Sequence, residues 1–200
     1  MHSILLATKN PGKVIEITSI LAGLPVKITS LLELPDVPDV VEDGETLEEN
    51  ALKKASEVYE RLRLPTIADD SGLEVYALGM KPGVLSARYA GEHVSYAENN
   101  LKLLRELSHV KAEGRKARFR CIAAFVAGEF VRTAEGACAG SITERAQGDG
   151  GFGYDPIFIP DGYDRTFAQL SIEIKNRISH RALAFRQMKD ILREYVNNLP

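Results

Sequence analysis

The sequence is poor in cysteine and has no strong excess of charge of either sign. Its 200 residues include two cysteines, Cys121 and Cys138, without the CxxC spacing that would suit a zinc site. We expect both to be reduced, as in a cytoplasmic protein, and not to form a disulfide. A formal net charge of −3 argues against a surface that binds nucleic acid, so we expect no nucleic-acid partner.

Long hydrophobic runs are also missing. No stretch approaches the roughly 18 consecutive apolar residues of a transmembrane helix, so we expect no membrane association. Residues Met1–Ile4 lead into a strand pattern without the basic segment and apolar run of a signal peptide, and we expect none. Repeats and low-complexity segments are absent as well. A chain of this length fits one domain or two intimate lobes, and we treat residues 1–200 as a single domain.

What the sequence does have is a pair of adjacent carboxylates after a short apolar segment. Thr66–Ala68 predicts a buried strand, Asp69 and Asp70 follow it, and Ser71 and Gly72 predict a turn. A strand that stops at two acids places charge at the carboxyl end of a sheet strand, where open α/β sheets bind ligands. Adjacent carboxylates also repel each other, which raises the pKa of one unless a cation lies nearby. The pair is typical of a divalent-metal site, a general base or both, and also of an ordinary turn.

The first segments predict a strand, a loop and a helix. Ser3–Thr8 is a continuous apolar run of the kind found in buried strands, and Val14–Leu24 has helical spacing. Between them, loop amides and a helix N-terminus beside Lys9 and Lys13 would suit an anion such as phosphate. The loop does not match the Walker A pattern, and a strand-to-helix turn often carries a lysine without any such role.

The rest of the chain alternates strands and helices, with one hairpin. The expected elements are a strand at Val26–Ser30, a helix at Thr46–Leu62, a loop at Lys81–Gly91, a helix from Ser95 to Leu107, a hairpin of Lys116–Ala127 and Glu129–Gly140 around Gly128, a glycine-dense loop and short strand at Gly148–Pro160, and a helix at His180–Asn197. Thr46 with Glu49 predicts a capping box at the first of these helices. Glu42 lies outside that box, which makes it the better candidate for a metal ligand. The pattern predicts an α/β fold with parallel and antiparallel strand pairs.

Six short motifs occur in order along the chain. They are Thr8-x-Asn10-x-x-Lys13, Glu49-Asn50-Ala51-x-x-Lys54-Ala55, Ala68-Asp69-Asp70-Ser71-Gly72-Leu73, Pro82-Gly83 through Ser86-Ala87-Arg88-Tyr89, Phe152-Gly153-Tyr154-Asp155-Pro156 and Ser179-His180-Arg181. The set resembles the inosine/xanthosine triphosphate pyrophosphatases, the Ham1-like house-cleaning nucleotidases. The likeness runs from residue 3 to about residue 190, and six motifs at compatible spacing make it specific. Gln169 and Ile174 depart mildly from acidic residues common in the family, whereas Lys175 is retained.

The resemblance implies a long curved mixed β-sheet flanked by helices, with two lobes and a central substrate cleft. It implies a hydrolase that uses Mg²⁺ to split noncanonical purine nucleoside triphosphates (ITP, dITP, XTP and dXTP) into the monophosphate and pyrophosphate, and that usually forms a homodimer. Asp70 would be the general base, and Glu42 with Asp69 or Asp70 would hold the metal. How the two aspartates divide these roles is left open by the sequence.

The resemblance also implies a set of substrate-binding residues. These are Thr8, Asn10, Lys13, Lys54, Ser71, Arg88, Phe152, Gly153, Tyr154, Asp155, Lys175, His180 and Arg181. Hypoxanthine and xanthine carry a carbonyl at position 6 where adenine carries an amino donor, so donors on Lys175, His180 and Arg181 would favour them. Such hydrogen-bonded sites can discriminate by about 10⁴–10⁵. Phe152 can stack on the ring, while His180 and Arg181 are equally typical of a solvated helix start.

Two other functions fit the sequence. One is a Maf-like pyrophosphatase that acts on standard or pyrimidine nucleoside triphosphates. The other is a purine nucleotide sensor without hydrolysis, against which the aspartate pair argues, because a pure binder gains little from acids beside phosphate.

Overall fold

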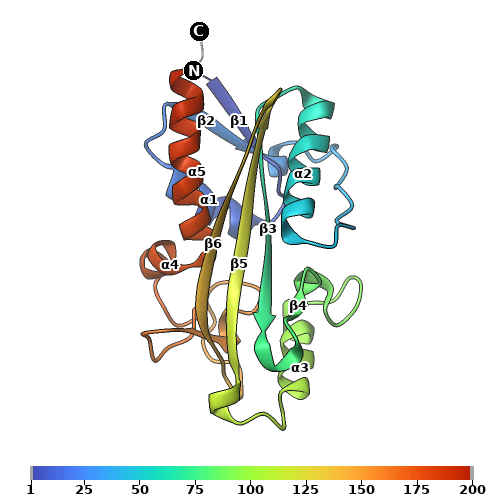
Figure 1. Cartoon of the computed structure of the whole chain (residues 1–200), viewed down its shortest axis with the longest axis vertical. Helices are drawn as coiled ribbons and strands as arrows, with labels where there is room; N and C mark the ends of the chain where they lie inside the picture. The colour runs from blue at the N-terminus through green and yellow to red at the C-terminus, as the bar shows by residue number, and fades with distance from the viewer. Residues whose placement is uncertain (1, 199–200) are drawn as a thin grey trace. The chain divides into compact units, whose positions relative to one another are not determined.

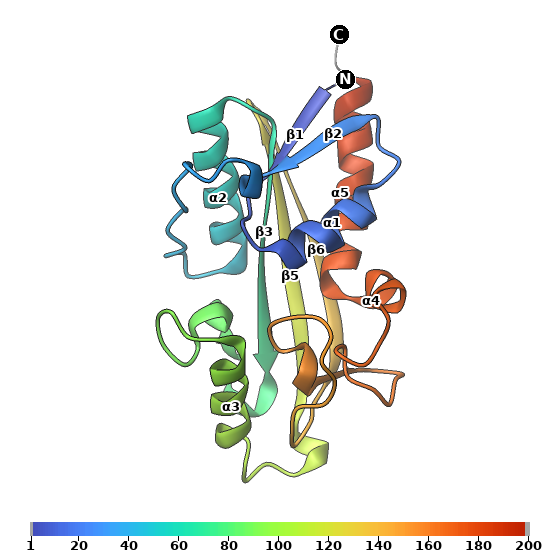
Figure 2. The ribbon, with the colours of Figure 1, turned by 180° about the vertical axis from the view of Figure 1, so that it is seen from behind.

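The protein has an α/β fold, which we describe for residues 2–198 of a computed structural model (Figures 1 and 2). The helices are α1 (Pro11–Leu21), α2 (Leu47–Leu62), α3 (Tyr96–Glu106), α4 (Ile172–Ile178) and α5 (His180–Asn197). The strands are β1 (His2–Leu6), β2 (Val26–Ser30), β3 (Thr66–Val75), β4 (Lys81–Gly83), β5 (Lys116–Ala127), β6 (Phe130–Ile142) and β7 (Phe158–Pro160).

The strands form one mixed sheet in the order β2-β1-β3-β5-β6-β7, with β4 paired to β3. β1 pairs in parallel with β2, from His2 opposite Val26 onward, and in parallel with β3. The β3–β4 and β6–β7 pairs are antiparallel. β5 and β6 are neighbours joined by Gly128 and the residue after it, and Gly128 has a positive φ of 67° that suits so short a turn. The expected α/β class, mixed sheet and hairpin are therefore confirmed.

The chain divides into two compact units. Unit 1 comprises Met1–Asp70, Cys121–Gly136 and Arg181–Pro200, and unit 2 comprises Ser71–Arg120 and Ala137–His180. Strands β3, β5 and β6 contribute residues to both units. Each unit has a hydrophobic core of its own, and each contains some of the candidate site residues.

In unit 1, helices cover both faces of the strands. Apolar side chains of β1, β3 and β5 pack against α1 and α5, while α2 lies on the other side of these strands (Figure 1). The buried residues Ala51, Ala55 and Val58 of α2 recur at helical spacing, which gives this helix one inward stripe. Lys189 of α5 donates to the carbonyls of Ile20 and Ala22 at the end of α1, which fixes the two helices to each other.

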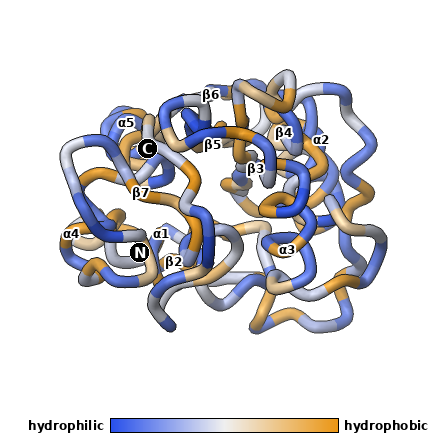
Figure 3. Tube along the Cα trace, turned by 90° about the horizontal axis from the view of Figure 1, so that it is seen from below, coloured by the Kyte–Doolittle hydropathy of each residue, from blue (hydrophilic) through white to orange (hydrophobic). Residues whose placement is uncertain are grey.

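In unit 2, α3 closes a core that is rich in aromatic side chains. Leu103 of α3 packs in the same cluster as Phe119, Phe158 and Phe167. α3 contains both hydrophobic and hydrophilic residues (Figure 3), and its buried residues Asn99, Asn100 and Leu103 recur at helical spacing, as expected of a helix with one buried face. The buried Arg115 donates to the carbonyls of Leu107, Val110 and Thr143, so its charge is surrounded by acceptors.

One local prediction is wrong, and it concerns the central acids. The strand expected at Thr66–Ala68 does not end there: β3 runs on through Asp69, Asp70, Ser71 and Gly72 to Val75. Beyond the acids, β3 pairs with β4 and its apolar residues are fully buried, and burial on this scale outweighs the local preference for a turn. In a continuing strand, adjacent side chains point to opposite faces. The side chains of Asp69 and Asp70 therefore point to opposite faces, and the turn expected at Ser71 and Gly72 is wrong as well.

Several element boundaries also differ from the predictions. α1 begins at Pro11 and not at Val14, because Asn10 Oδ1 accepts the N–H of Lys13 and proline fits the first helical turn. The expected loop Lys81–Gly91 contains β4 and a turn of 3-10 helix. The predicted capping box at the start of α2 is confirmed, and Ser95 with Glu98 forms another at the start of α3. Within residues 2–198, no helix combines the length and the hydropathy that a membrane crossing requires.

Candidate functional site

Asp69 is a buried carboxylate held by cations from two helices. Its Oδ2 lies 2.9 Å from Lys13 Nζ of α1 and 3.4 Å from Arg181 Nη2 of α5. Burial alone would raise the pKa of this carboxyl, but the charges of Lys13 and Arg181 hold it well below its usual range. Arg181 is itself buried, and its Nη1 lies 2.7 Å from Glu16 Oε2. Asp69 is therefore the ionised partner of two cations at neutral pH.

Asp70 has the opposite electrostatic environment. Its Oδ2 accepts a hydrogen bond from Asn50 Nδ2 of α2 at 3.2 Å, and the residue is 7% exposed. Burial raises the pKa of Asp70 to about 6; the charge of Lys54 opposes this rise, and that of Glu42 adds to it. A carboxyl of this pKa is ionised at pH 7 and can still take up a proton, which suits a general base.

Lys54 brings the acidic segment before α2 to the aspartates. Its ammonium group forms an ion pair with Glu42 and donates to the backbone carbonyl of Asp69 at 2.8 Å. Burial alone would lower the pKa of Lys54, but the negative charges of Glu42, Asp69 and Asp70 outweigh it and raise the pKa. Lys13 Nζ also lies 3.5 Å from the carbonyl oxygen of Asp69. Two lysines from different helices thus meet at one point of β3.

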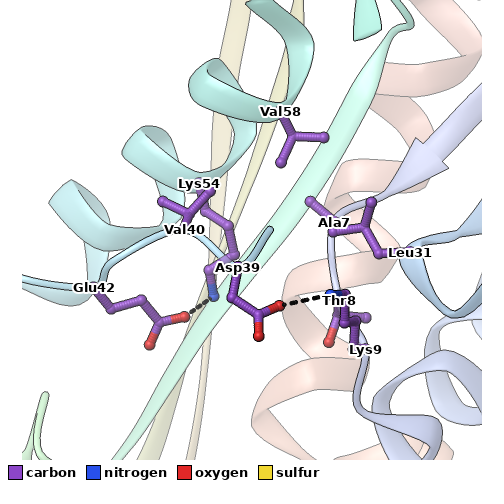
Figure 4. Close-up of a pocket in the computed structure, with 9 residues that line it drawn as sticks. All are labelled: Ala7, Thr8, Lys9, Leu31, Asp39, Val40, Glu42, Lys54 and Val58. Carbon is purple, nitrogen blue, oxygen red and sulfur yellow. Dashed lines mark ion pairs between the residues drawn. The ribbon is translucent and has the colours of Figure 1, made fainter. Parts of the chain in front are cut away.

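Lys9 holds the segment that leads to Glu42. Its Nζ donates to the carbonyl of Val37 at 2.8 Å and lies 3.4 Å from Asp39 Oδ1. Lys9 and Asp39 line a small pocket of about 120 Å³, in which they point toward each other, as do Lys54 and Glu42 (Figure 4). Lys9 is therefore engaged with its own chain, unlike the phosphate-facing lysine that its place in the loop predicted.

The remaining unit 1 residues of the set lie where β1 leads into α1. Thr8 Oγ1 accepts the backbone N–H of Asn10 at 3.1 Å, and Asn10 caps α1 by accepting the N–H of Lys13 at 3.2 Å. The first turn of α1 contains no acidic residue, so its positive dipole end is not neutralised within the helix. Such an end, with the ammonium of Lys13 on the same turn, suits an anion.

Unit 2 holds a buried ion pair beside an aromatic ring. Lys175 Nζ of α4 pairs with Asp155 Oδ2, and both side chains are 4% exposed. Asp155 Oδ2 also accepts the backbone N–H of Phe152 at 2.8 Å, and Lys175 Nζ lies 4.8 Å from the centre of the Phe152 ring. Three of the predicted substrate-binding residues, Phe152, Asp155 and Lys175, are thus brought together.

Other predicted residues of unit 2 have structural partners. The His180 ring stacks on Phe119, with ring centres 4.5 Å apart and planes 10° from parallel. The Tyr154 hydroxyl donates to the carbonyl of Ser86 at 2.9 Å, and Gly153 accepts from Asn100 Nδ2 at 3.1 Å.

Ser71 and Arg88 complete the predicted set in unit 2. Ser71 is half-buried in β3, and strand alternation places it on the face of Asp69 and not on that of Asp70. Arg88 Nε lies 3.7 Å from Glu92 Oε1. The substrate-binding roles of both residues stay predictions.

Two residues of the unit 1 cluster were missed from the sequence, namely Glu16 and Asn50. Both are polar residues on the inward stripe of a helix: Glu16 precedes Ile17 of α1, and Asn50 precedes Ala51 of α2. Both are also almost completely buried, at 3% and 1% exposure. A polar residue at such a position needs a partner, which is the signal that could have found them.

The donors around Asp70 fit a hard divalent cation such as Mg²⁺. No group of three His, Cys, Asp or Glu side chains within residues 2–198 is arranged as a complete metal cage. Mg²⁺ does not need one, because it is commonly held by one or two carboxylates and substrate phosphates. Burial is the main cause of the raised pKa of Asp70 and the charge of Glu42 adds to it, so a cation between the two carboxylates would favour the ionised form of both. The charge of Asp69 is already balanced by Lys13 and Arg181, so Asp69 is a weaker candidate for the metal ligand.

Comparisons with known proteins agree with this arrangement. The model of the Ham1 family matches residues 4–191. The chain is 49% identical over 197 residues to the dITP/XTP pyrophosphatase of Geobacillus kaustophilus, covering 98% of this chain and 97% of the relative. It is 50% identical over 193 residues to the dITP/XTP pyrophosphatase of Geobacter sulfurreducens, covering 96% and 97%. The solved structure of a HAM1 protein from Coxiella burnetii matches with a TM-score of 0.88 at 38% identity, covering 97% of this chain and 100% of that one.

Proposed function

The chain belongs to the Ham1 family, and we propose that it hydrolyses dITP, ITP, XTP and dXTP to the monophosphate and pyrophosphate, which removes these noncanonical purine nucleotides from the nucleotide pool. The observation that carries the proposal is the cluster on β3. There, two lysines meet at the carbonyl of Asp69, and Asp70, with a pKa of about 6, follows it. Cations for a triphosphate and a base for water are what phosphoryl chemistry requires of a protein.

Each residue of this cluster has a role in the proposed reaction. The ammonium groups of Lys13 and Lys54, with the N-terminus of α1, bind the negative charge of the triphosphate. Asp70 accepts a proton from the attacking water at its carboxylate. Glu42 and Asp70 would hold Mg²⁺, while Asp69 fixes the charged groups of Lys13 and Arg181. Bound Mg²⁺ would supply neutralisation of the developing charge on the phosphates.

Base selection rests on unit 2 in this proposal. Lys175 presents N–H donors to the 6-carbonyl of hypoxanthine or xanthine, and Asp155 fixes the ammonium in place. Phe152 offers a ring face for stacking. Adenine would set its amino donor against the Lys175 donors, which is the mismatch that such a site rejects. Homodimer formation and a cytoplasmic location stay predictions.

A substrate panel tests the proposed function. We expect dITP and XTP to be hydrolysed with a kcat/KM at least about 100-fold above that of dATP, because adenine carries an amino donor where hypoxanthine and xanthine carry the 6-carbonyl. We also expect lower values for dTTP and UTP, whose bases have a single ring, and for dGTP, whose guanine shares the 6-carbonyl and differs from hypoxanthine by its 2-amino group. Pyrophosphate release and chromatography of the nucleotide product measure the reaction. Preferential hydrolysis of dTTP or UTP would identify the Maf-like activity instead, and binding of dITP without pyrophosphate release would identify a sensor.

Removal of the divalent cation tests the metal ligands. We expect EDTA to abolish hydrolysis and Mg²⁺ to restore it. We also expect Mg²⁺ at 100 times its Kd to stabilise the wild-type protein by about 2.7 kcal/mol, because it binds only the folded state. Urea denaturation measures that gain without reference to activity. A Glu42→Gln, Asp70→Asn double variant stabilised by Mg²⁺ as much as the wild type would place the metal at other residues.

A further inference from the structure

Asn50 is a buried amide that joins two segments of the unit 1 cluster. Its Nδ2 donates to Asp70 Oδ2 at 3.2 Å, and its Oδ1 accepts the backbone N–H of Gly44 at 2.8 Å. A carboxylate only accepts and a backbone N–H only donates, so the two partners fix the orientation of the amide. The side chain is thus held at both ends.

Only a glycine at position 44 permits this contact. A Cβ at position 44 would lie 2.7 Å from Asn50 Oδ1 and 2.9 Å from Glu49 Cβ, closer than real Cβ atoms approach. Its φ is not in the left-handed region, so the need for glycine is one of space and not of backbone conformation. Gly44 lies two residues after Glu42, so the same hydrogen bond holds the segment that carries Glu42.

Helix capping does not explain Asn50. The start of α2 already has a complete capping box: Thr46 Oγ1 accepts the N–H of Glu49, and Glu49 Oε2 accepts the N–H of Thr46. An apolar residue at position 50 would simply extend the inward stripe of α2, whereas a buried amide has a desolvation cost. The amide is therefore in excess of what this helix needs in order to form and pack.

We propose that Asn50 is a positioning residue for the reaction, an inference that rests on the proposed function. Asn50 fixes the rotation of the Asp70 carboxylate and couples it to the segment of residues 42–44. Its side-chain hydrogen bonds within the described residues go to Asp70 and Gly44 and to neither Lys13 nor Lys54, so it acts on the base and not on the binding of the triphosphate.

The test compares Asn50→Leu with a matched control. We expect Asn50→Leu to lower kcat for dITP about 10- to 100-fold, as is usual for partners of catalytic groups, with KM changed by less than about 3-fold. Asn99→Leu is the control, because Asn99 of α3 is also 1% exposed and bonded at both ends, to Ala87 and Ala90. Both variants lose stability, but only Asn50→Leu should lower kcat.

A second route leaves the Asn50 side chain in place. Gly44→Ala pushes the amide away from its position, and we expect the same loss of kcat and no further loss when it is combined with Asn50→Leu. In an Asp70→Asn background, Asn50→Leu should cost less than about 2-fold, because its effect passes through Asp70. If Asn50 acted only through folding, the kcat loss from Asn50→Leu would multiply the kcat loss from Asp70→Asn.

The outcomes separate the two proposals. A wild-type protein that does not hydrolyse dITP overturns the proposed function, and the role of Asn50 with it. If the wild type is active, two results overturn the role of Asn50 alone. One is that the losses of Asn50→Leu and Asp70→Asn multiply in the double variant. The other is that Asn50→Leu and Asn99→Leu lower kcat equally. If Asn50→Leu does not fold, Gly44→Ala carries the test. Failure of both to fold would make Asn50 a structural residue.

Discussion

Replacing Asp70 with asparagine is expected to slow dITP hydrolysis by roughly 10²–10⁴, the usual contribution of a general base, while stabilising the metal-free protein at neutral pH. The loss of rate follows because an amide cannot take the proton from water. The gain in stability follows because the amide removes a buried charge that the folded state disfavours. Asparagine still offers an oxygen to the Asn50 Nδ2 donor, so the hydrogen bond between the two residues is kept.

The sign of the stability effect comes from the pKa of Asp70. Folding raises this pKa from 3.8 to about 6, so the folded state binds the proton more tightly than the unfolded state. The stability contributed by this group is complete below pH 3.8 and is lost as the pH rises through 6. Above both values the ionised Asp70 costs about 3 kcal/mol. The advantage of Asp70→Asn should therefore be largest near pH 7–8 and shrink toward pH 4.

Urea denaturation in EDTA between pH 4 and pH 8 measures this prediction, beside initial rates with Mg²⁺. Asp69→Asn is the matched control, because the pKa of Asp69 is lowered and its loss leaves Lys13 and Arg181 with less negative charge. We expect that variant to be less stable than the wild type at pH 7. Turnover close to the wild-type rate would remove Asp70 from the mechanism, and a destabilised Asp70→Asn would contradict the pKa assignment.

Replacing Arg181 with methionine is expected to destabilise the protein by about 3–5 kcal/mol, the cost of breaking a buried ion pair from one side. The guanidinium lies between Glu16 and Asp69, and the three residues are at most 3% exposed. Without it, Glu16 loses a charged partner at 2.7 Å, and Asp69 keeps its contact with Lys13. The variant should therefore unfold at markedly lower urea concentration.

A compensating substitution tests the electrostatic origin of this loss. Glu16→Gln removes the charge that Arg181→Met leaves exposed to a low-dielectric interior, so the double variant should recover part of the stability. The sequence predicted that Arg181 donates hydrogen bonds to the purine base. A variant Arg181→Met with wild-type stability and a selective loss of discrimination between dITP and dATP would favour that role over the one derived from its buried contacts.

Local sequence signals set the positions of several elements directly. Thr46 with Glu49 and Ser95 with Glu98 place the starts of α2 and α3, because a capping box satisfies backbone N–H groups within four residues of chain. The alternation of Val26 and Ile28 with polar residues gives β2 with its bounds unchanged. These signals depend only on neighbours in the sequence, which is why the pattern is sufficient.

The extent of β3 illustrates where local signals fail. Asp69 to Gly72 has the composition of a turn, and no residue nearby in the sequence opposes that interpretation. The strand continues because Leu73 and Val75 are buried and β4 pairs with them. Both conditions depend on segments that only folding brings together.

From the sequence alone came the family motifs, the α/β class and the presence of two adjacent acids, since composition and short-range spacing are enough for each. Tertiary structure alone decided that these acids differ. Asp69 faces Lys13 and Arg181, and Asp70 faces Asn50, because successive strand residues point to opposite sides. The pKa of a carboxyl depends on burial and on charges that lie close in space, and here most of those charges come from distant parts of the chain.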